Sequence, residues 1–404
     1  MKKGRLIVSL DIGTVKTSVI VGEIGEAGLH IIGRGSSHSK GLRKGAIINI
    51  EDAVESVKEA VREAEAVTGI EINAVYLGIG GEHISSLSSH GVIALSKEEI
   101  GQRDVDSVID AARAVAIPFD REVLQVIPVG FSINGQNGIT DPRGMGGVRL
   151  EADVRIITGS ATFVQNFVKT CEKAGLEVTD IVLKPFATAE AVITDDERSL
   201  GTAVIDIGGG TTEIAIFHEG LLCHTSVVPV GGNNFTNDIA IGLRTPAPEA
   251  EKIKKEFGCT MISMVSDDEE IEIAYSGDRQ AKSVPRHLLI EIIQPRAVEL
   301  FKLIKDEIRA SGFDGLLSSG AVLTGGSAMM EGMDVMAENI LDMPVRIGTP
   351  AGIEGITDDI SSPMYATGVG LLLYGAREMR AENEKHSRWG ISRVINWARE
   401  TLHL

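Results

Sequence analysis

The sequence has few cysteines, few aromatic residues and no long apolar run. Its three cysteines, Cys171, Cys223 and Cys259, lie far apart without a CxxC pair or a nearby histidine, which argues against a disulfide framework or a zinc site. Aromatic residues make up only 4%, so we expect cores of Ile, Val, Leu and Ala. No window reaches the ~18 apolar residues of a membrane-spanning helix, and the first apolar run ends at Asp11, too early for a signal peptide. We therefore expect a protein made and kept in the cytoplasm.

Positive charge is scarce over most of the chain. The formal net charge of −18 argues against a non-specific nucleic-acid binder, because affinity for phosphate needs clustered Lys and Arg. Residues 385–404 differ, with a net charge of +3 and both tryptophans of the sequence. The chain thus combines an acidic body with a short basic end.

A faint internal repeat indicates two related domains. Residues 6–21 (LIVSLDIGTVKTSVIV) and 202–217 (TAVIDIGGGTTEIAIF) each read as an apolar strand, Asp-Ile-Gly, a Thr-containing turn and a second strand. A second echo, 74–81 (AVYLGIGG) and 321–327 (AVLTGGS), follows in the same order. In a chain of 404 residues this predicts two domains of one architecture.

Helices are expected between these strands. The apolar spacing predicts helices over 51–68, 104–115, 162–174 and 290–310, the first of them capped by Asn49. β-Branched strands that alternate with helices predict an α/β fold.

Two segments depart from the alternation and are interpreted as inserted modules. Residues 85–160 contain two Asn-Gly pairs, at 134–135 and 137–138, that are hairpin signals. Residues 232–287 form a second, more helical insert with an acidic hairpin. Residues 380–388 (RAENEKHSR) are charged and are interpreted as a linker.

Two loops carry the residues expected of a phosphate site. Each begins with an aspartate that ends a buried strand and so needs a cation or donors around it, followed by glycine, whose backbone amides can face an anion. The first loop contains Asp11, Gly13, Thr14 and Lys16, and the second contains Asp206, Gly208, Gly209, Gly210, Thr211 and Thr212. One such loop can be only a β-hairpin, but two copies favour a clamp on a polyphosphate, with Mg²⁺ held through water between Asp11 and Asp206.

A third motif, Thr324-Gly325-Gly326-Ser327, follows the longest predicted helix. Its glycines would let a flat base and sugar lie on the backbone, although a Gly pair after a strand is usually just a turn. The sequence lacks a Walker A motif, a GxGxxG after the first strand, HExxH and GxSxG.

The ordered motifs resemble the actin, sugar-kinase and heat-shock chaperone superfamily. The resemblance assigns five segments in order along the chain. They are phosphate 1 (DIGT and the following Lys16), connect 1 (KPFATAEA, 184–191), phosphate 2 (DIGGGTT, from residue 206), adenosine (LTGGS, 323–327) and connect 2 (ATGVG, 366–370). Within it the chain is most similar to the bacterial FtsA cell-division family, through 229–240 (PVGGNNFTNDIA), the module at 85–160 and the short amphipathic end.

The resemblance implies an actin-like fold, with two RNase H-like lobes around a nucleotide cleft. The implied segments are a first lobe at 1–84 and 161–198 with its insert at 85–160, a second lobe at 199–231 and 288–379 with its insert at 232–287, a linker at 380–388 and an amphipathic membrane-targeting helix at 389–404.

The resemblance implies that the chain binds ATP and Mg²⁺. The two glycine loops would contact the phosphates and the metal. Residues implied to approach ribose, adenine and base are Gly231, Gly232, Asn233, Glu251, Lys254, Gly325, Gly326 and Ser327. Glu251 and Lys254 can equally be a solvated face of a helix at 247–257.

Chaperone ATPases of the superfamily place an acid just before the connect 1 proline, where this chain has Lys184. Glu190 and Glu213 remain possible bases, but nothing in the sequence gives either of them the geometry that a base requires, so we predict a nucleotide switch with slow or negligible hydrolysis.

The C-terminal end has the pattern of a helix that lies in a membrane interface. On a helical wheel its apolar side chains share one arc with Arg at both borders. The expected lipid contacts are Trp389, Ile391, Val394, Ile395, Trp397 and Leu402. A last helix docked on the body is the alternative. Basic residues near an anionic surface contribute about 1 kcal/mol each, so one copy would be held weakly and an array of copies far more tightly.

The implied partners are the division GTPase FtsZ through its C-terminal peptide, further copies of the chain in filaments, anionic lipid and later division proteins. The implied location is the cytoplasmic face of the membrane at the division site. Arg296 and Glu299, at i and i+3 of a helix, are candidate contacts for FtsZ, and an exposed intrahelical ion pair is the alternative. A pilus or secretion assembly ATPase and a small-molecule kinase remain alternative functions; no catalytic Asp for a kinase is found.

Overall fold

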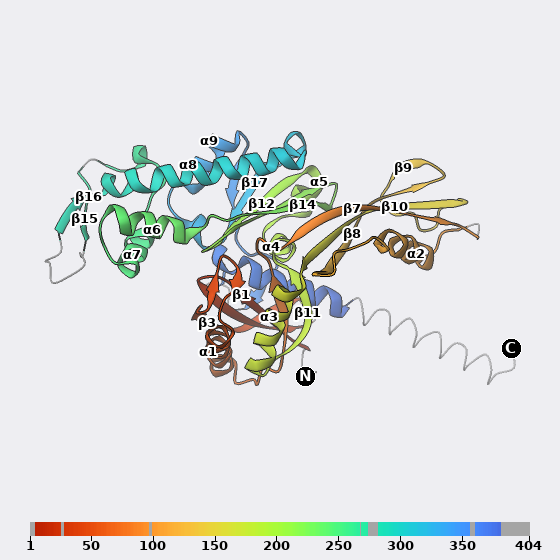
Figure 1. Ribbon diagram of the computed structural model, residues 1–404, viewed down its shortest axis with the longest axis horizontal. Helices are drawn as coiled ribbons and strands as arrows, with labels where there is room; N and C mark the ends of the chain where they lie inside the picture. Colours follow the sequence, from red (N-terminus) through yellow and green to blue (C-terminus); the bar gives the residue numbers. More distant parts are fainter. Residues whose placement is uncertain are drawn as a thin grey trace.

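The computed structural model describes residues 5–25, 28–96, 99–266, 268–273, 282–355 and 360–380. Two large sheets lie one below the other in Figure 1. The first has the order β11-β6-β1-β2-β3-β19, with β1 (Arg5–Ile12), β2 (Lys16–Ile24), β3 (Leu29–His38), β6 (Ala74–Ile79), β11 (Glu177–Leu183) and β19 (Glu354–Gly355). The second has the order β14-β13-β12-β17-β18, with β12 (Thr202–Ile207), β13 (Thr212–His218), β14 (Leu221–Val228), β17 (Ala321–Thr324) and β18 (Val345–Ile347).

The pairing of these strands confirms the repeat expected from the sequence. β1 pairs antiparallel with β2 and parallel with β6, and β2 pairs antiparallel with β3. β12 has the same relation to β13 and β17, and β13 to β14. Asp11 and Asp206 therefore stand near the carboxyl ends of equivalent strands, the edge at which α/β sheets bind ligands.

Helices cover both faces of each sheet. α1 (Ile50–Thr68) and α3 (Ala161–Ala174) pack on the outer face of the first sheet, and α6 (Gly232–Gly242), α8 (Arg286–Ser311) and α9 (Met333–Leu341) on that of the second. α4 (Lys184–Val192) and a helix over 366–380 lie between the sheets and share one apolar core with both (Figure 1).

The ends of the predicted helices follow the expected capping residues. Asn49 Oδ1 accepts hydrogen bonds from the N–H groups of Glu51 and Asp52 at the start of α1. Gly69 and Gly175 end α1 and α3 in the left-handed conformation. α8 begins four residues earlier than the sequence predicts, at Arg286.

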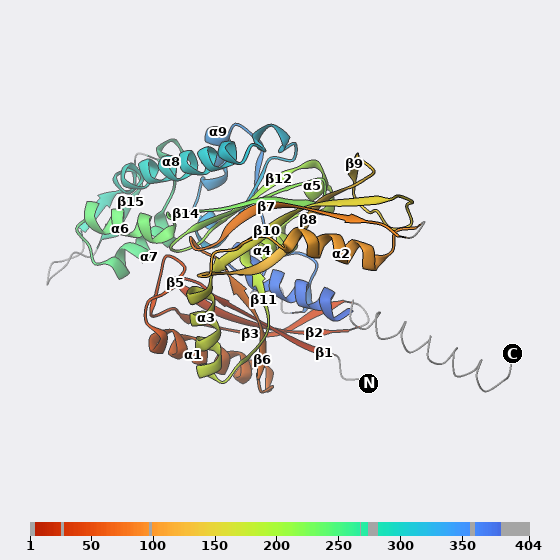
Figure 2. The same ribbon diagram turned by 45° about the vertical axis from the view of Figure 1, so that its right-hand side comes forward.

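The first inserted module is a sheet of order β7-β10-β8-β9 covered by α2 (Gln102–Arg113), as Figure 2 shows. Its strands are β7 (Ser85–Ala94), β8 (Arg121–Ile133), β9 (Gln136–Ile139) and β10 (Arg149–Ser160). Asn134 and Gly135, with φ of 54° and 85°, form the predicted turn between β8 and β9. The turn predicted at 137–138 is wrong, because both residues lie inside β9, opposite a register shift of β8 that is typical of a bulge.

Several shorter elements connect those already described. They are β4 (Leu42–Arg43), β5 (Ala46–Ile47), α5 (Asp195–Leu200), α7 (Ala247–Phe257), the hairpin of β15 (Glu270–Ile273) and β16 (Lys282–Pro285), and short 3-10 turns η1 (Ile262–Met264), η2 (Asp314–Leu316), η3 (Gly326–Met329) and η4 (Pro363–Tyr365). No helix in the described ranges is long and apolar enough to cross a membrane. The predicted helix at 389–404, and the predicted linker beyond residue 380, lie outside the described residues.

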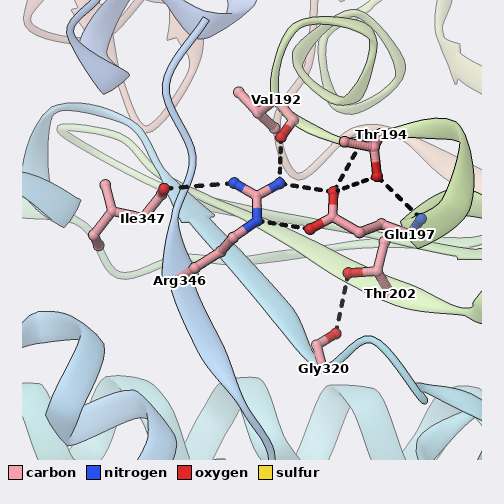
Figure 3. Close-up of polar contacts among 7 residues, drawn as sticks. All are labelled: Val192, Thr194, Glu197, Thr202, Gly320, Arg346 and Ile347. Atoms are coloured by element: carbon pink, nitrogen blue, oxygen red, sulfur yellow. Dashed lines mark hydrogen bonds and ion pairs between the residues drawn. The ribbon is translucent and has the colours of Figure 1, made fainter. Parts of the chain in front are cut away.

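The chain crosses from the first sheet to the second through α4 and α5. Arg346 of β18 forms hydrogen bonds and an ion pair with residues of this crossing (Figure 3). Its guanidinium donates to both carboxylate oxygens of Glu197, at 2.6 and 2.7 Å, and to the carbonyl oxygen of Val192 at 2.7 Å. The same glutamate accepts from the Thr194 N–H at 2.8 Å and so caps α5. The crossing is thus fastened to the edge of the second sheet.

Candidate functional site

A cleft of about 670 Å³ opens between the two sheets. It gathers most of the residues that the sequence selects, although they come from five separate stretches of chain. Those that line it are Asp11, Gly13, Thr14, Lys16, Asp206, Gly208, Gly209, Gly210, Thr211, Gly232, Asn233, Glu251, Lys254, Gly325, Gly326 and Ser327. The predicted residues Thr212 and Gly231 do not line it. Thr212 Oγ1 donates to the carbonyl oxygen of Val230 at 2.8 Å, behind the second loop.

The two glycine loops form the same turn and face each other. The N–H of Gly13 donates to the carbonyl oxygen of Lys16, and that of Gly208 to Thr211, each at 3.0 Å. A Cβ at Gly209 would lie 2.3 Å from Val15 Cγ2 of the opposite loop. The second loop is therefore rich in glycine because the side chains of the first occupy the space.

In the first loop Asp11 meets an ammonium group. Lys184, the first residue of α4, lies with Nζ 2.8 Å from Asp11 Oδ1 and donates to the carbonyl oxygen of Ile12 at 2.8 Å. Burial acts to lower the pKa of Lys184, but Asp11, Glu213 and Asp206 together raise it. This lysine is therefore charged at neutral pH.

In the second loop Asp206 meets hydroxyl groups. Its Oδ2 accepts from Thr367 Oγ1 at 3.1 Å and Thr188 Oγ1 at 3.4 Å. Burial, with the nearby charge of Asp11, raises the pKa of Asp206. Because Thr188 lies on α4 and Thr367 on the helix over 366–380, this carboxylate also joins the two helices that cross between the lobes.

Glu213 is the third carboxylate of the cleft. It lies directly across the strand pair from Asp206, and a Cβ at Gly80 would lie 2.2 Å from its Oε1. Its Oε2 is buried with no hydrogen-bond partner among the described residues, and burial raises the pKa of Glu213 to about 8. The other base considered from the sequence, Glu190, is wrongly placed for that role, because it pairs with Arg198 and Arg377 and does not line the cleft.

These carboxylates suit a hydrated Mg²⁺ better than a directly bound metal. Within the described ranges no three Asp, Glu, His or Cys groups lie close enough to hold a metal ion. The unpartnered oxygen of Glu213 and the raised pKa values of Glu213 and Asp206 indicate carboxylates that lack a cation. Asp11, Asp206 and Glu213 are the residues that would hold the ion through its waters, as Mg²⁺ favours.

Lys16 crosses from the first loop to the segment before the helix over 366–380. Its Nζ donates to the carbonyl oxygen of Met364 at 2.8 Å and lies 3.5 Å from the ring centroid of Tyr365. Burial lowers the pKa of Lys16 to about 8, although Asp11 acts to raise it. Lys16 is thus charged at neutral pH and lines the cleft.

α6 and α7 form the wall opposite the first loop. The N–H groups of Gly232 and Asn233 donate to the carbonyl oxygens of Gly208 and Gly209 at 2.9 and 2.7 Å, which joins the start of α6 to the second loop. Lys254 Nζ lies 2.6 Å from Glu251 Oε2 and its side chain is only 9% exposed. The alternative of a solvated helix face is therefore wrong for Lys254.

At the third motif glycine is required at one position. Gly325 has φ of 87°, and a Cβ there would lie 2.2 Å from Asp206 Oδ1. Ser327 Oγ donates to the carbonyl oxygen of Gly208 at 3.2 Å, which ties this motif to the second loop. Sequence reasoning missed Gly45, whose N–H donates to Thr14 Oγ1 at 2.9 Å, because the two lie 31 residues apart.

Arg296 and Glu299 lie on α8, away from the cleft. Arg296 pairs with Glu299 as expected, and its guanidinium also donates to both oxygens of Asp238 on α6, at 2.6 and 3.1 Å. The alternative of a purely intrahelical pair is therefore incomplete.

Family models match two parts of the chain. The model described as cell division protein FtsA matches residues 203–370, and the one described as an SHS2 domain inserted in FTSA matches residues 81–158. The chain is 45% identical over 379 residues to the cell division protein FtsA of Pseudomonas aeruginosa, covering 94% of this chain and 91% of the relative. It is 41% identical over 387 residues to that of Bacillus subtilis, covering 95% and 87%.

Solved structures show similarity of fold at much lower identity. A PilM-PilN type IV pilus biogenesis complex matches with a TM-score of 0.67 at 16% identity, covering 92% of this chain and 98% of that one. MreB5 of Spiroplasma citri bound to ADP matches with a TM-score of 0.58 at 15% identity, covering 94% and 98%. These likenesses confirm the actin-like fold expected from the ordered motifs.

Proposed function

The chain belongs to the FtsA family of cell-division proteins, and from this premise we propose that it binds ATP with Mg²⁺ in the cleft between its lobes. The observation that carries the proposal is the pair of like-folded loops, which form the same turn, line one cleft from opposite sides and bring carboxylates to it. Phosphates would lie between the loops, Mg²⁺ would balance their charge through water, and the base would lie toward Gly325, Gly326 and Lys254. A structural neighbour, MreB5, is bound to ADP.

Hydrolysis would be slow. Lys184 stands at the start of α4 in place of an acid, and Glu213 is the acidic side chain left in the cleft that could orient a water molecule. With Mg²⁺ bound nearby, the charge of the ion would stabilise the Glu213 carboxylate and lower its basicity, so Glu213 would hold the ion through water and would be a poor base. The residues of the cleft would therefore bind and orient the nucleotide rather than hydrolyse it rapidly.

The body would polymerise on the inner face of the cytoplasmic membrane at the division site. The fold is shared with MamK, solved as a double helical filament, at a TM-score of 0.53. The tail sequence at 389–404 has the amphipathic pattern of an interfacial helix. One copy of such a helix would bind the membrane weakly, whereas an array of copies would bind it tightly. In an array, each bound helix raises the effective concentration of its neighbours at the membrane surface.

The filament would tether the FtsZ ring and recruit later division proteins. The FtsZ peptide would bind at the second insert, where Arg296, Asp238 and Glu299 offer a charged cluster between α6 and α8.

Sedimentation with anionic liposomes tests this proposal. The full chain with ATP should sediment with the liposomes, and deletion of 389–404 should release it into the supernatant while ATP binding stays intact. A second variant, W389S/W397S in the full-length chain, keeps the basic residues and loses two apolar contacts with lipid. Less of this variant than of the wild type should sediment with the liposomes. Unchanged sedimentation of the deletion variant would contradict the membrane role.

A further inference from the structure

The nucleotide cleft contains a lysine whose ammonium stands among carboxylates. Lys184 Nζ lies 2.8 Å from Asp11 Oδ1, and the side chains of both residues are nearly buried, at 13% and 14% exposed. Asp206 and Glu213 act on the same ammonium electrostatically. One fixed positive charge thus serves three acidic groups.

The surrounding backbone is shaped to hold this lysine in place. Lys184 begins α4 directly after β11, and Pro185 at the first turn fixes the direction of the helix. Its ammonium is also held by the carbonyl oxygen of Ile12, which ends β1. A Cβ at Gly78 of β6 would lie 3.3 Å from Lys184 Cγ, so the glycine leaves the path of the side chain open.

A polyphosphate that enters this cleft meets the negative charge of the same carboxylates. Buried like charges repel each other and repel the ligand unless a cation stands between them. In kinase and ATPase sites Mg²⁺, bound by one or two carboxylates and the substrate phosphates, supplies that cation. Here part of the positive charge belongs to the chain itself and is present before any ligand arrives.

We infer that Lys184 is a tethered cation that replaces part of the charge of the metal, so that Mg²⁺ has to balance only the charge on Asp206 and Glu213 and nucleotide binding depends less on Mg²⁺ than it would without the lysine. The inference rests on the proposed binding of nucleotide, and it assigns to Lys184 a positioning role that acts through Asp11. With the lysine removed, Asp11 loses its partner and Mg²⁺ becomes necessary to neutralise the carboxylates.

The test compares the Kd of the full-length chain for a non-hydrolysable ATP analogue in excess Mg²⁺ and in EDTA. The wild-type chain should bind in both conditions, with Kd values that differ by less than about tenfold. In Lys184→Met the Kd in Mg²⁺ should stay close to that of the wild type, whereas the Kd in EDTA should rise about 10- to 100-fold, the range expected for one charged hydrogen-bonded contact. Lys184→Arg, which keeps the charge, should restore binding in EDTA at least in part.

Lys252→Met is the matched control. Lys252 lies on α7 but does not line the cleft, is 73% exposed and pairs with Glu249, so its removal should leave both Kd values and their ratio unchanged. A merely structural role of Lys184 would raise both Kd values equally, and that result would overturn the inference. So would loss of wild-type binding in EDTA, a measurement that does not depend on whether any variant folds. Failure of the wild type to bind in Mg²⁺ would instead refute the proposed function, so the two failures are distinguishable.

Discussion

In the first lobe Asp11 ends β1 beside the ammonium of Lys184, whereas in the second lobe Asp206 ends β12 among the hydroxyl groups of Thr188 and Thr367. The strand order and the turn that follows are the same in both. Across the strand pair, Asp11 faces Ser18 and Asp206 faces Glu213. A duplicated backbone therefore carries two different charge environments, one in which the aspartate contacts an ammonium group and one in which it contacts hydroxyl groups.

The loops differ in side-chain volume as well as in charge. Thr14 and Val15 of the first loop correspond to Gly209 and Gly210 of the second, and the larger pair fills the space between the lobes. Each lobe is thus shaped by the other, which is why one loop alone does not make the site.

The largest effect is expected at Gly209. In Gly209→Ala the new Cβ would lie 2.3 Å from Val15 Cγ2, so the loops must separate. Overpacking of this kind costs about 1–3 kcal/mol, and we expect nucleotide affinity to fall at least about tenfold, measured by equilibrium titration and urea unfolding. Val15→Ala removes the atom in contact, so the double variant should recover part of both losses. Equal effects of the single and double variants would show that the loops do not constrain each other.

An intermediate effect is expected from Glu213, the carboxylate that the first lobe lacks. Its pKa is raised from 4.5 to about 8, so the folded state favours the protonated acid; this stability is fully present below about pH 4.5 and is lost progressively as pH rises to about 8. Glu213→Gln stays neutral, so in EDTA the variant should gain about 1 kcal/mol over the wild type for each pH unit between pH 6 and pH 8. Urea unfolding across that range is the measurement.

Ser18→Ala provides the control from the first lobe, because Ser18 occupies the equivalent position opposite Asp11. Its difference from the wild type should not vary with pH. If Glu213→Gln also gave a difference independent of pH, the account of an ionisable group that lacks a cation would be wrong.

The smallest effect is expected at the crossing between the lobes. Arg346→Met removes the two contacts with Glu197 and the one with Val192, all partly exposed (Figure 3). We expect a loss of about 0.5–1.5 kcal/mol in the free energy of unfolding and no change in nucleotide affinity, because the cleft is lined by other residues. Arg377→Met, which loses one contact of 2.9 Å with Glu190 and the more distant approach of its guanidinium to the rings of Phe186 and Tyr374, should cost less. A loss of affinity in Arg346→Met would show that the crossing and the cleft are coupled.

The repeat could be predicted from the sequence because each copy is a local pattern of apolar strand, Asp-Ile-Gly and turn. The loops and the capped helices likewise depend on residues close together in the chain, such as Asn49 with α1. The pairing of Lys184 with Asp11 could not be predicted, since it joins residues far apart in sequence. The same limit explains why Glu190 was wrongly considered as a base. It pairs with Arg198 and Arg377, which only the fold brings near it.

The second Asn-Gly pair, at 137–138, shows another limit. Both pairs have the composition of a hairpin turn, and only the register of β9 on β8 decides which of them turns and which bulges.

A crystal structure of the full-length chain with an ATP analogue and Mg²⁺ tests the central claim most directly. The account predicts one nucleotide with its phosphates between residues 13–16 and 208–211, within hydrogen-bonding distance of backbone N–H groups from both loops. A nucleotide that contacted only one lobe, or an empty cleft at millimolar nucleotide, would contradict it.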